Sequence, residues 1–446
     1  MAEMKKLAVL CLCLALAPGC KKKFESYGVS IELESRSLPN GLRVIMIEDH
    51  TMPVISYQTW FRVGSVDEKP GHTGISHLVE HMMFKGTPKY PAKQLFQVLE
   101  ARGANINAFT TRDYTAFHEE FTPDLLPKVI ELEADRMANL AIEEDALKTE
   151  QMIVFEEHRL HTENSPVGKI QEALWALAFR THPYRWPVIG IPGEASRIPR
   201  EKVQEWLKKY YIPANAVIVA CGDLKPDKTM ELIEKYYGPV PGGSRSKREI
   251  APEAAQNEER RLIMRAKVAS ERLSEAYHIT SADNDESYAI DVLANIMFEG
   301  TSSRAYRRLV DEKNIAISVS GSSFTPAHPG LFMITATMNS SIPAAAAETE
   351  LDLIIKELQE KPVSHEEIAA AVKQLTLQIV DGIRTPHGLA QLIGTVTAIF
   401  DDPERFSEDI IKYTKVTPGD VQQAAQKYLI PNNRVVVTLV PEAKIK

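Results

Sequence analysis

The feature of the sequence that most constrains the fold is an internal repeat. Residues 203–219 align without a gap on residues 421–437 at an offset of 218, and both copies contain Val-Gln followed by Ile-Pro-x-Asn. Residues 83–87 read Met-Phe-Lys-Gly-Thr and residues 297–301 read Met-Phe-Glu-Gly-Thr, at an offset of 214. Two similar offsets indicate one duplicated unit. We therefore expect two homologous domains built on one plan.

Both halves alternate between strand and helix periodicity, which predicts the α+β class, with a mostly antiparallel sheet packed by helices in each domain. In the first half, strands are expected at residues 42–48, 54–63, 105–110, 114–121 and 216–221, and helices at about 73–86, 91–102, 124–140, 144–162, 167–179 and 200–210. In the second half, strands are expected at residues 261–267, 273–279, 315–322, 331–338 and 435–440, and helices at 287–298, 303–311 and 418–428, with three more helices before the last of these.

A stretch rich in Gly, Pro and charge begins at residue 237, which is typical of a linker between domains. The predicted domains are residues 30–238 and 259–446, and the predicted linker is 239–258.

Residues 71–86 contain three side chains capable of chemistry within one helical turn, namely His77, Glu80 and His81. In a helix, His77 and His81 at i and i+4 share a face, so their imidazole nitrogens can reach one ion. The order His-x-x-Glu-His is a zinc peptidase motif, in which two neutral imidazoles bind Zn²⁺ and the carboxylate activates a water molecule. The sequence therefore predicts His77 and His81 as metal ligands and Glu80 as the general base. A third ligand must come from elsewhere in the chain.

The second copy of the repeat lacks this motif. At the offset of 214, the counterparts of the three motif positions are Asp291, Ala294 and Asn295. The duplication therefore predicts that the first domain alone carries the chemistry.

The first 20 residues are predicted to be a bacterial lipoprotein signal peptide. Two lysines precede an apolar run at residues 7–17, which is too short to span a bilayer. The run ends in Leu-Ala-Pro-Gly-Cys20, similar to a lipoprotein cleavage site, so Cys20 is the predicted lipidation site. Lys21, Lys22 and Lys23 are expected to form a solvated tether beside the anchor. We expect a protein of the bacterial cell envelope, lipid-anchored at the outer membrane, facing the periplasm and with no other membrane attachment.

Composition excludes two classes of protein. The chain has 52 Lys and Arg against 60 Asp and Glu, so no basic excess points to a nucleic-acid partner. Once residues 1–19 are removed, Cys20 and Cys221 are the remaining cysteines, which excludes a disulfide framework. Cys221 follows an apolar run and is expected to be a buried structural thiol.

With these motifs, the chain resembles the pitrilysin/insulinase family of inverted-motif zinc metallopeptidases, in its short two-domain form. The resemblance covers nearly the whole chain after the signal segment, and it depends on four stretches in order: residues 74–87, 103–115, 182–190 and 300–309. It implies two domains that face each other around a chamber, one Zn²⁺ per chain, and hydrolysis of peptides or unfolded protein segments.

The resemblance also implies that the third zinc ligand is Glu157, which follows His81 by 76 residues. Periodicity alone does not separate Glu157 from Glu156, since both have apolar neighbours along the predicted helix. Glu150 matches an acidic position of the family near the site, and we expect it to orient a metal ligand.

Residues 105–110 resemble the family's edge strand that holds substrate. Asn107, Ala108 and Phe109 are therefore the predicted substrate contacts, with a peptide added to the sheet as one more strand through main-chain hydrogen bonds.

Three further histidines lie near these motifs. His158 and His161 stand at helical spacing beside Glu157 and could be imagined as a second metal site, but we expect them to be surface histidines. His182, in the third of the four stretches, is expected to have a structural hydrogen-bonding role.

One departure from the family bears on function. Active relatives carry an Arg and, seven residues later, a Tyr that hold the substrate near the zinc, whereas this chain has Val310 and Ile317 at those positions. Neither side chain can donate a hydrogen bond. We therefore expect a homologous partner subunit that supplies the missing pair in a heterodimer. Arg304, Arg307 and Arg308 are local alternatives, although residues 303–309 are expected to form a helix that packs elsewhere. The alternatives are a non-catalytic scaffold subunit and a peptide-binding module with a vestigial zinc site.

Overall fold

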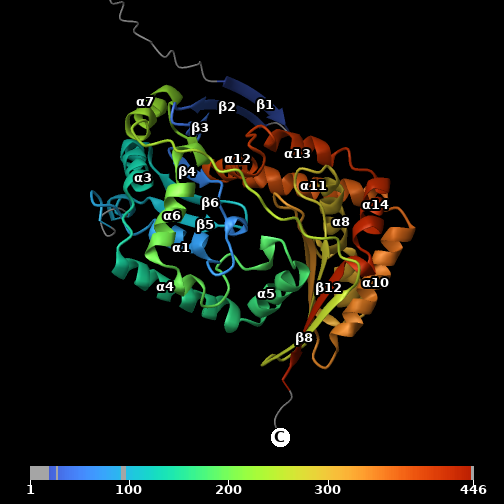
Figure 1. Ribbon diagram of the computed structural model, residues 1–446. Helices are drawn as coiled ribbons and strands as arrows, with labels where there is room; N and C mark the ends of the chain where they lie inside the picture. Colours follow the sequence, from blue (N-terminus) through green and yellow to red (C-terminus); the bar gives the residue numbers. More distant parts are fainter. Residues whose placement is uncertain (1–19, 27–28, 92–96, 443–446) are drawn as a thin grey trace, which may run out of the picture.

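Two sheets form the framework of the computed structural model, which describes residues 20–26, 29–91 and 97–442 (Figure 1). The first sheet has the strand order β1-β2-β3-β7-β4-β6-β5 and the second has the order β10-β11-β9-β12-β8. The strands of the first sheet are β1 (Cys20–Ser26), β2 (Val29–Ser37), β3 (Arg43–Glu48), β4 (Ile55–Phe61), β5 (Asn105–Thr110), β6 (Thr115–Phe121) and β7 (Ala216–Gly222). Those of the second are β8 (Arg260–Ala266), β9 (Arg272–His278), β10 (Ala316–Phe324), β11 (Leu331–Met338) and β12 (Arg434–Pro441).

The helices of the first half are α1 (Ile75–Met82), α3 (Leu126–Asn139), α4 (Glu144–His158), α5 (Pro166–Ala178), α6 (Arg200–Tyr210) and α7 (Pro226–Tyr237). Those of the second half are α8 (Glu286–Phe298), α9 (Arg304–Tyr306), α10 (Ala344–Glu360), α11 (His365–Gly382), α12 (Pro386–Phe400), α13 (Phe406–Tyr413) and α14 (Pro418–Tyr428). Four helices, α10 to α13, precede α14 where the sequence predicted three, so that prediction was wrong. The predicted helix at 91–102 lies partly outside the described residues.

The duplication predicted from the sequence is visible in the topology. The strands β5-β6-β4-β7-β3 correspond in order to β10-β11-β9-β12-β8, and the last pair of each set is parallel whereas the others are antiparallel. The turns before β7 and β12 are also built alike. Asn215 Nδ2 donates to the carbonyl of Tyr210 at 2.9 Å, and Asn433 Nδ2 donates to the carbonyl of Tyr428 at 2.8 Å.

One helix of each half packs on the sheet of the other half. Side chains of α12 pack with β3, β4 and β7 in a core that includes Trp60 and Ile393, and side chains of α5 pack against β9, β11 and β12 in a core that includes Trp175 and Val437. The two helices start alike: Ser165 and Thr385 cap them, each accepting from a glycine N–H, at 3.1 and 3.0 Å. The exchange ties the two halves together along both sheets.

The lysines after Cys20 do not form the solvated tether that was predicted. Residues 20–26 are strand β1, which pairs antiparallel with β2. Lys21 Nζ lies 3.2 Å from Glu34 and Lys22 Nζ donates to Glu404 at 2.8 Å, so acidic neighbours compensate the positive charge that favoured a loop. The predicted signal segment, residues 1–19, lies outside the described residues, and lipidation of Cys20 stays a prediction. In the part of the chain that the structure describes, no helix is long and apolar enough to cross a membrane.

Candidate metal centre

His77 and His81 on α1 face Glu157 on α4. His77 Nε2 lies 4.0 Å and His81 Nε2 lies 3.5 Å from the same oxygen, Glu157 Oε2, and one possible ligand atom from each residue lies within 4.8 Å of the others. The imidazole centroids are 4.7 Å apart, as expected for histidines at i and i+4. Two imidazoles and a carboxylate therefore converge on one point.

The start of α1 is fixed by a buried carboxylate and a glycine. Glu68 accepts hydrogen bonds from the N–H groups of Gly74 and Ser76 at 2.8 and 2.9 Å, which satisfies two of the free donors at the start of the helix. Gly74 has a φ of +85°, and a Cβ there would lie 2.4 Å from the carbonyl oxygen of Ile189. The loop at residues 182–190 thus packs against the start of the motif helix, which gives that stretch a structural role.

Glu150 occupies the position expected for a residue that orients a ligand. Its Oε2 lies 3.0 Å from His81 Nδ1, and its Oε1 lies 2.5 Å from Lys85 Nζ. Burial opposes ionisation of Glu150, but hydrogen bonds to His81 and Lys85 outweigh it and lower the pKa of the carboxyl. An ionised Glu150 holds the His81 ring with Nε2 toward Glu157. Lys85 was not anticipated from the sequence, since it lies outside the motif.

The two imidazoles are in different electrostatic environments. Burial, together with the neighbouring His81, lowers the pKa of His77 to about 4, so His77 is neutral and can donate a lone pair to a metal. Burial also opposes protonation of His81, but hydrogen bonds to Glu150 and Glu157 raise its pKa to about 9. The site therefore accommodates a positive charge between His81 and Glu157. A bound metal cation would supply the same charge. His77 Nδ1 is buried without a hydrogen-bond partner.

Glu80 lies beside the cluster and is buried. Its Oε2 accepts a hydrogen bond from Thr110 Oγ1 at the end of β5. Burial raises the pKa of the Glu80 carboxyl, and the hydrogen bond from Thr110 opposes the rise. A carboxyl with a raised pKa is suited to accept a proton from water. Thr110 belongs to the second of the four family-like stretches, but nothing in its spacing indicated the contact with Glu80.

The structure separates the two glutamates that periodicity could not. Glu156 is exposed, and both of its carboxylate oxygens lie 2.9 Å from Arg159 Nη1, away from the histidines. Glu157 faces them. The donor set of His77, His81 and Glu157 is the kind that binds zinc at catalytic sites, where three protein ligands leave one position for water.

The predicted substrate strand, β5, is the last strand of the first sheet, and β6 is its only partner among the described strands. The N–H of Ala108 is bonded to the Asn107 side chain at 2.9 Å rather than to β6. The side chain of Phe109 lies on the face of the sheet opposite to Thr110 and Glu80, where its ring is 5.6 Å from that of Trp60. Since side chains alternate along a strand, Asn107 shares the face of Phe109, and Ala108 shares the face of Thr110.

The expectation that His158 is a surface histidine was wrong, because α5 covers it. His158 is buried, and its Nε2 lies 3.1 Å from Glu172 Oε2 on α5. His161 is exposed, as expected. His182 is buried, and its Nδ1 accepts from the N–H of Tyr184 at 3.2 Å, in agreement with a structural role. Cys221 is buried, as expected.

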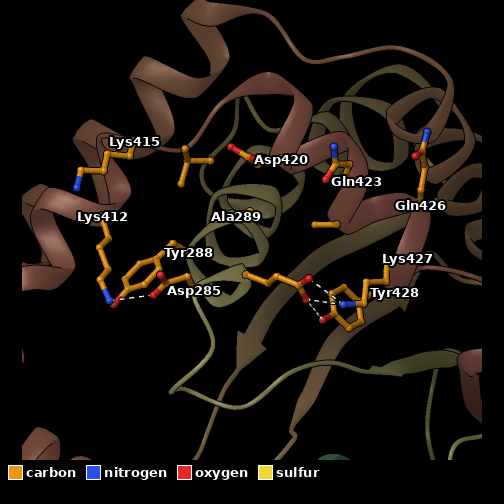
Figure 2. A pocket seen from close by; sticks show the side chains of 13 residues that line it. Asp285, Tyr288, Ala289, Lys412, Lys415, Asp420, Gln423, Gln426, Lys427 and Tyr428 are labelled. Carbon is orange, nitrogen blue, oxygen red and sulfur yellow. Dashed lines mark hydrogen bonds and ion pairs between the residues drawn. The ribbon is translucent and has the colours of Figure 1, made fainter.

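A pocket of about 610 Å³ lies in the second half, between α8 and α14 (Figure 2). Four of its charged side chains form two pairs: Lys412 Nζ donates to Asp285 at 2.9 Å, and Lys427 Nζ donates to Glu286 at 2.7 Å. None of its described residues belongs to a group that could hold a metal. This pocket is separate from the candidate metal centre.

Comparisons with known proteins agree with this geometry. A model of the insulinase family, peptidase family M16, matches residues 43–190, and a model of the M16 inactive domain matches residues 197–375. The zinc protease PqqE of Helicobacter pylori is 24% identical, with 98% of this chain and 99% of that protein aligned.

Solved structures show the same fold. The crystal structure of a protease from Helicobacter pylori has a TM-score of 0.87 and 25% identity, and the match covers 92% of this chain and 99% of that one. The periplasmic protease PqqL from Escherichia coli has a TM-score of 0.74 and 16% identity, over 92% of this chain and 47% of that one. The family resemblance inferred from four short stretches is thereby confirmed across both halves, and the chain belongs to the insulinase family of peptidases, peptidase family M16.

Proposed function

We propose that this chain is a zinc-dependent endopeptidase that hydrolyses peptides or unfolded protein segments. The observation that carries the proposal is the convergence of His77, His81 and Glu157 within 4.8 Å of one another, with Glu80 at their side. The name of the Helicobacter pylori relative, a zinc protease, supports the same chemistry.

Zinc held by His77, His81 and Glu157 would polarise a peptide carbonyl and activate a water molecule. Glu80 would accept the proton of that water and then deliver it to the leaving amine. Thr110 holds the Glu80 carboxylate by a hydrogen bond. Glu150 fixes the His81 ring through Nδ1, at 3.0 Å, and so determines which nitrogen faces Glu157.

Substrate binds along the open edge of β5 as an added strand. Thr110 at the end of β5 contacts Glu80, so a peptide laid along this edge passes directly beside the general base. Main-chain recognition of this kind selects an extended conformation more than a particular side chain. The substrate class is therefore flexible or unfolded polypeptide, with Asn107, Ala108 and Phe109 as the proposed contacts.

The proposed enzyme is the catalytic subunit of a heterodimer in the bacterial cell envelope. Val310 is partly buried beside the core of the second half, and Ile317 is exposed on β10. Both side chains are hydrocarbons, so neither can donate a hydrogen bond to substrate. A homologous partner is proposed to provide the Arg and Tyr. The signal pattern at residues 1–20, with lipidation at Cys20, supports export and anchoring at the outer membrane facing the periplasm.

A second candidate function is a non-catalytic or vestigial-zinc subunit that binds peptides or scaffolds an envelope assembly. One observation favours it: the Arg and Tyr of active relatives are replaced by Val310 and Ile317. The two candidates differ in whether the protein hydrolyses peptides with Glu80 as the base.

The test compares wild type with Glu80→Gln, in the presence of zinc and an unstructured reporter peptide. Because the amide keeps the shape of the side chain and lacks its basicity, Glu80→Gln should bind zinc as wild type does, and its rate should fall by about 10²–10⁴-fold. His81→Ala should lose the zinc of this site together with the activity. If the Gln variant cleaves the peptide at the wild-type rate, Glu80 is not the base. If wild type, mixed with its partner, neither binds zinc nor cleaves, the scaffold function stands instead.

A further inference from the structure

A second set of metal-binding side chains lies on the opposite face of the first sheet. It consists of His118 and Glu120 on β6 and His387 in the first turn of α12, and one possible ligand atom from each lies within 4.8 Å of the others. Successive residues of a strand point to opposite faces. Thr110 contacts Glu80 on one face, whereas the adjacent Phe109 has its ring 6.2 Å from that of His118 on the other. The two clusters are therefore separate.

The contacts within this second cluster are close. His387 Nδ1 lies 3.0 Å from Glu120 Oε1, and the rings of His118 and His387 are 4.7 Å apart at 63°. This ring separation equals that of His77 and His81 in the candidate metal centre. Both clusters thus offer two imidazoles and one carboxylate, with the same separation between the rings.

His118 has a buried nitrogen for which the protein provides no partner. The residue is 9% exposed, and its Nδ1 makes no hydrogen bond. A buried polar atom without a partner costs free energy, and such atoms in native proteins are usually satisfied by an ion or a water. The neighbouring side chains of Glu120 and His387 are about one third exposed, at 32% and 27%, so an ion could reach the site from solvent.

Gln58 and Thr385 fix the backbone around His387, and the Gln58 amide also lies 3.4 Å from His387 Nδ1. Gln58 Nε2 on β4 donates to the carbonyl oxygen of His387 at 3.1 Å, and Thr385 caps the helix by accepting from the N–H of Gly388 at 3.0 Å. The start of α12 is thereby held against the sheet before any ion binds. A site whose ligands are positioned in advance loses less conformational entropy on binding.

We propose that His118, Glu120 and His387 form a second divalent metal site, for Zn²⁺ or a related transition metal, which fastens α12 of the second half to the sheet of the first half. Two imidazoles with a carboxylate favour zinc, nickel or copper over magnesium or calcium, which prefer oxygen ligands. The ligands at positions 118 and 387 are 269 residues apart, so an ion shared between them closes a long loop across the two halves. An ion that binds the folded chain but not the unfolded chain stabilises the fold, so we assign this ion a structural role.

The plain alternative is an ion pair between His387 and Glu120 beside a neutral His118, with no metal. Metal content separates the two readings. Full-length mature protein is stripped with a chelator, saturated with Zn²⁺, desalted and analysed by mass spectrometry of the metal. We expect two zinc ions per chain in wild type, one in His387→Ala and one in His81→Ala. His365→Ala, an exposed histidine at the start of α11, is the matched control and should keep two.

A stability measurement covers the case in which metal content alone is ambiguous. In the His81→Ala background, which lacks the candidate catalytic site, added Zn²⁺ should raise the melting temperature by at least about 3 °C. The same addition to His81→Ala/His387→Ala, or to His81→Ala/Glu120→Gln, should leave it unchanged. The proposal is overturned if His387→Ala keeps as many zinc ions as wild type, or if the zinc-induced rise in melting temperature does not depend on His387. Because the proposed peptidase site is counted through His81, its failure would appear as a separate loss.

Discussion

His81 Nδ1 lies 3.0 Å from Glu150 Oε2, on the side of the ring away from Nε2, which faces Glu157 at 3.5 Å. The His81 ring therefore lies between two carboxylates. Glu150 orients the ring, and Glu157 is the other proposed ligand of the same ion. The buried Glu150 is in turn held by Lys85 at 2.5 Å. A cation next to Glu150 keeps it ionised, which strengthens its hold on the Nδ1 proton.

We predict that Glu150→Gln lowers zinc affinity by about 10–100-fold without abolishing binding, because a neutral amide accepts a weaker hydrogen bond from His81. Competition with a chromophoric chelator measures the change. Glu144→Gln, at an exposed position of the same helix, is the control and should match wild type. An affinity for zinc in Glu150→Gln equal to that of wild type would mean that His81 is oriented without Glu150.

We predict that Glu157→Gln loses most of its zinc affinity, whereas Glu156→Gln keeps it. Glu157 faces both histidines, and Glu156 is turned toward Arg159 at 2.9 Å. The two variants have the same charge change one residue apart, so each serves as the other's control. Equilibrium dialysis against zinc gives the ratio directly. The reverse result would place the third ligand at position 156.

Local periodicity predicted the parts of the site that depend on one helix. His77 and His81 share a face at i and i+4 whatever the rest of the fold does, so their pairing followed from spacing. The choice between Glu156 and Glu157 did not follow from spacing, because the apolar residues of α4 do not mark its buried face. Met152 and Ile153 on α4 are 70% and 45% exposed, so an apolar neighbour on this helix does not mark an inward face.

The exchange of helices between halves was beyond the reach of periodicity. The apolar pattern of α5 predicts a buried face, but it does not say which sheet covers that face. His158 was misjudged because spacing does not show which helix covers it; the carboxylate that it meets, Glu172, lies on α5. The same limit applies to His118 and His387, which no local spacing connects.

We predict that Gly394→Ala lowers the free energy of unfolding by about 1–3 kcal/mol, because α12 packs closely against Trp60. A Cβ at position 394 would lie 2.1 Å from the Trp60 ring, which is fully buried. Urea unfolding followed by tryptophan fluorescence measures the change. Gly382→Ala on α11, with no atom within 4 Å of the added Cβ, is the control and should be neutral or slightly stabilising. Equal stability of Gly394→Ala and wild type would show that α12 does not pack on β4 as described.

The last prediction concerns the proposed partner subunit. Arginines near the departure at Val310 could in principle replace the missing donors from within the chain. Arg304, however, is bound by Glu367 at 2.9 and 3.0 Å, and Arg308 is bound by Glu357 at 2.9 Å. Both pairs direct these two guanidinium groups toward α10 and α11, whereas Arg307, the third nearby arginine, is exposed.

We therefore expect the isolated chain to cleave an unstructured peptide slowly. Addition of a homologue that lacks the zinc motif and carries the Arg and Tyr should raise kcat/KM by about 10²–10³-fold, the usual effect of one well-placed donor to the transition state. The matched control is the same homologue with its Tyr changed to Phe, which should bind this chain without giving full activation. Addition of the homologue to Glu80→Gln should give no activity, which separates activation of this chain from activity of the partner. Full activity of the isolated chain, unaltered by the homologue, would contradict the heterodimer.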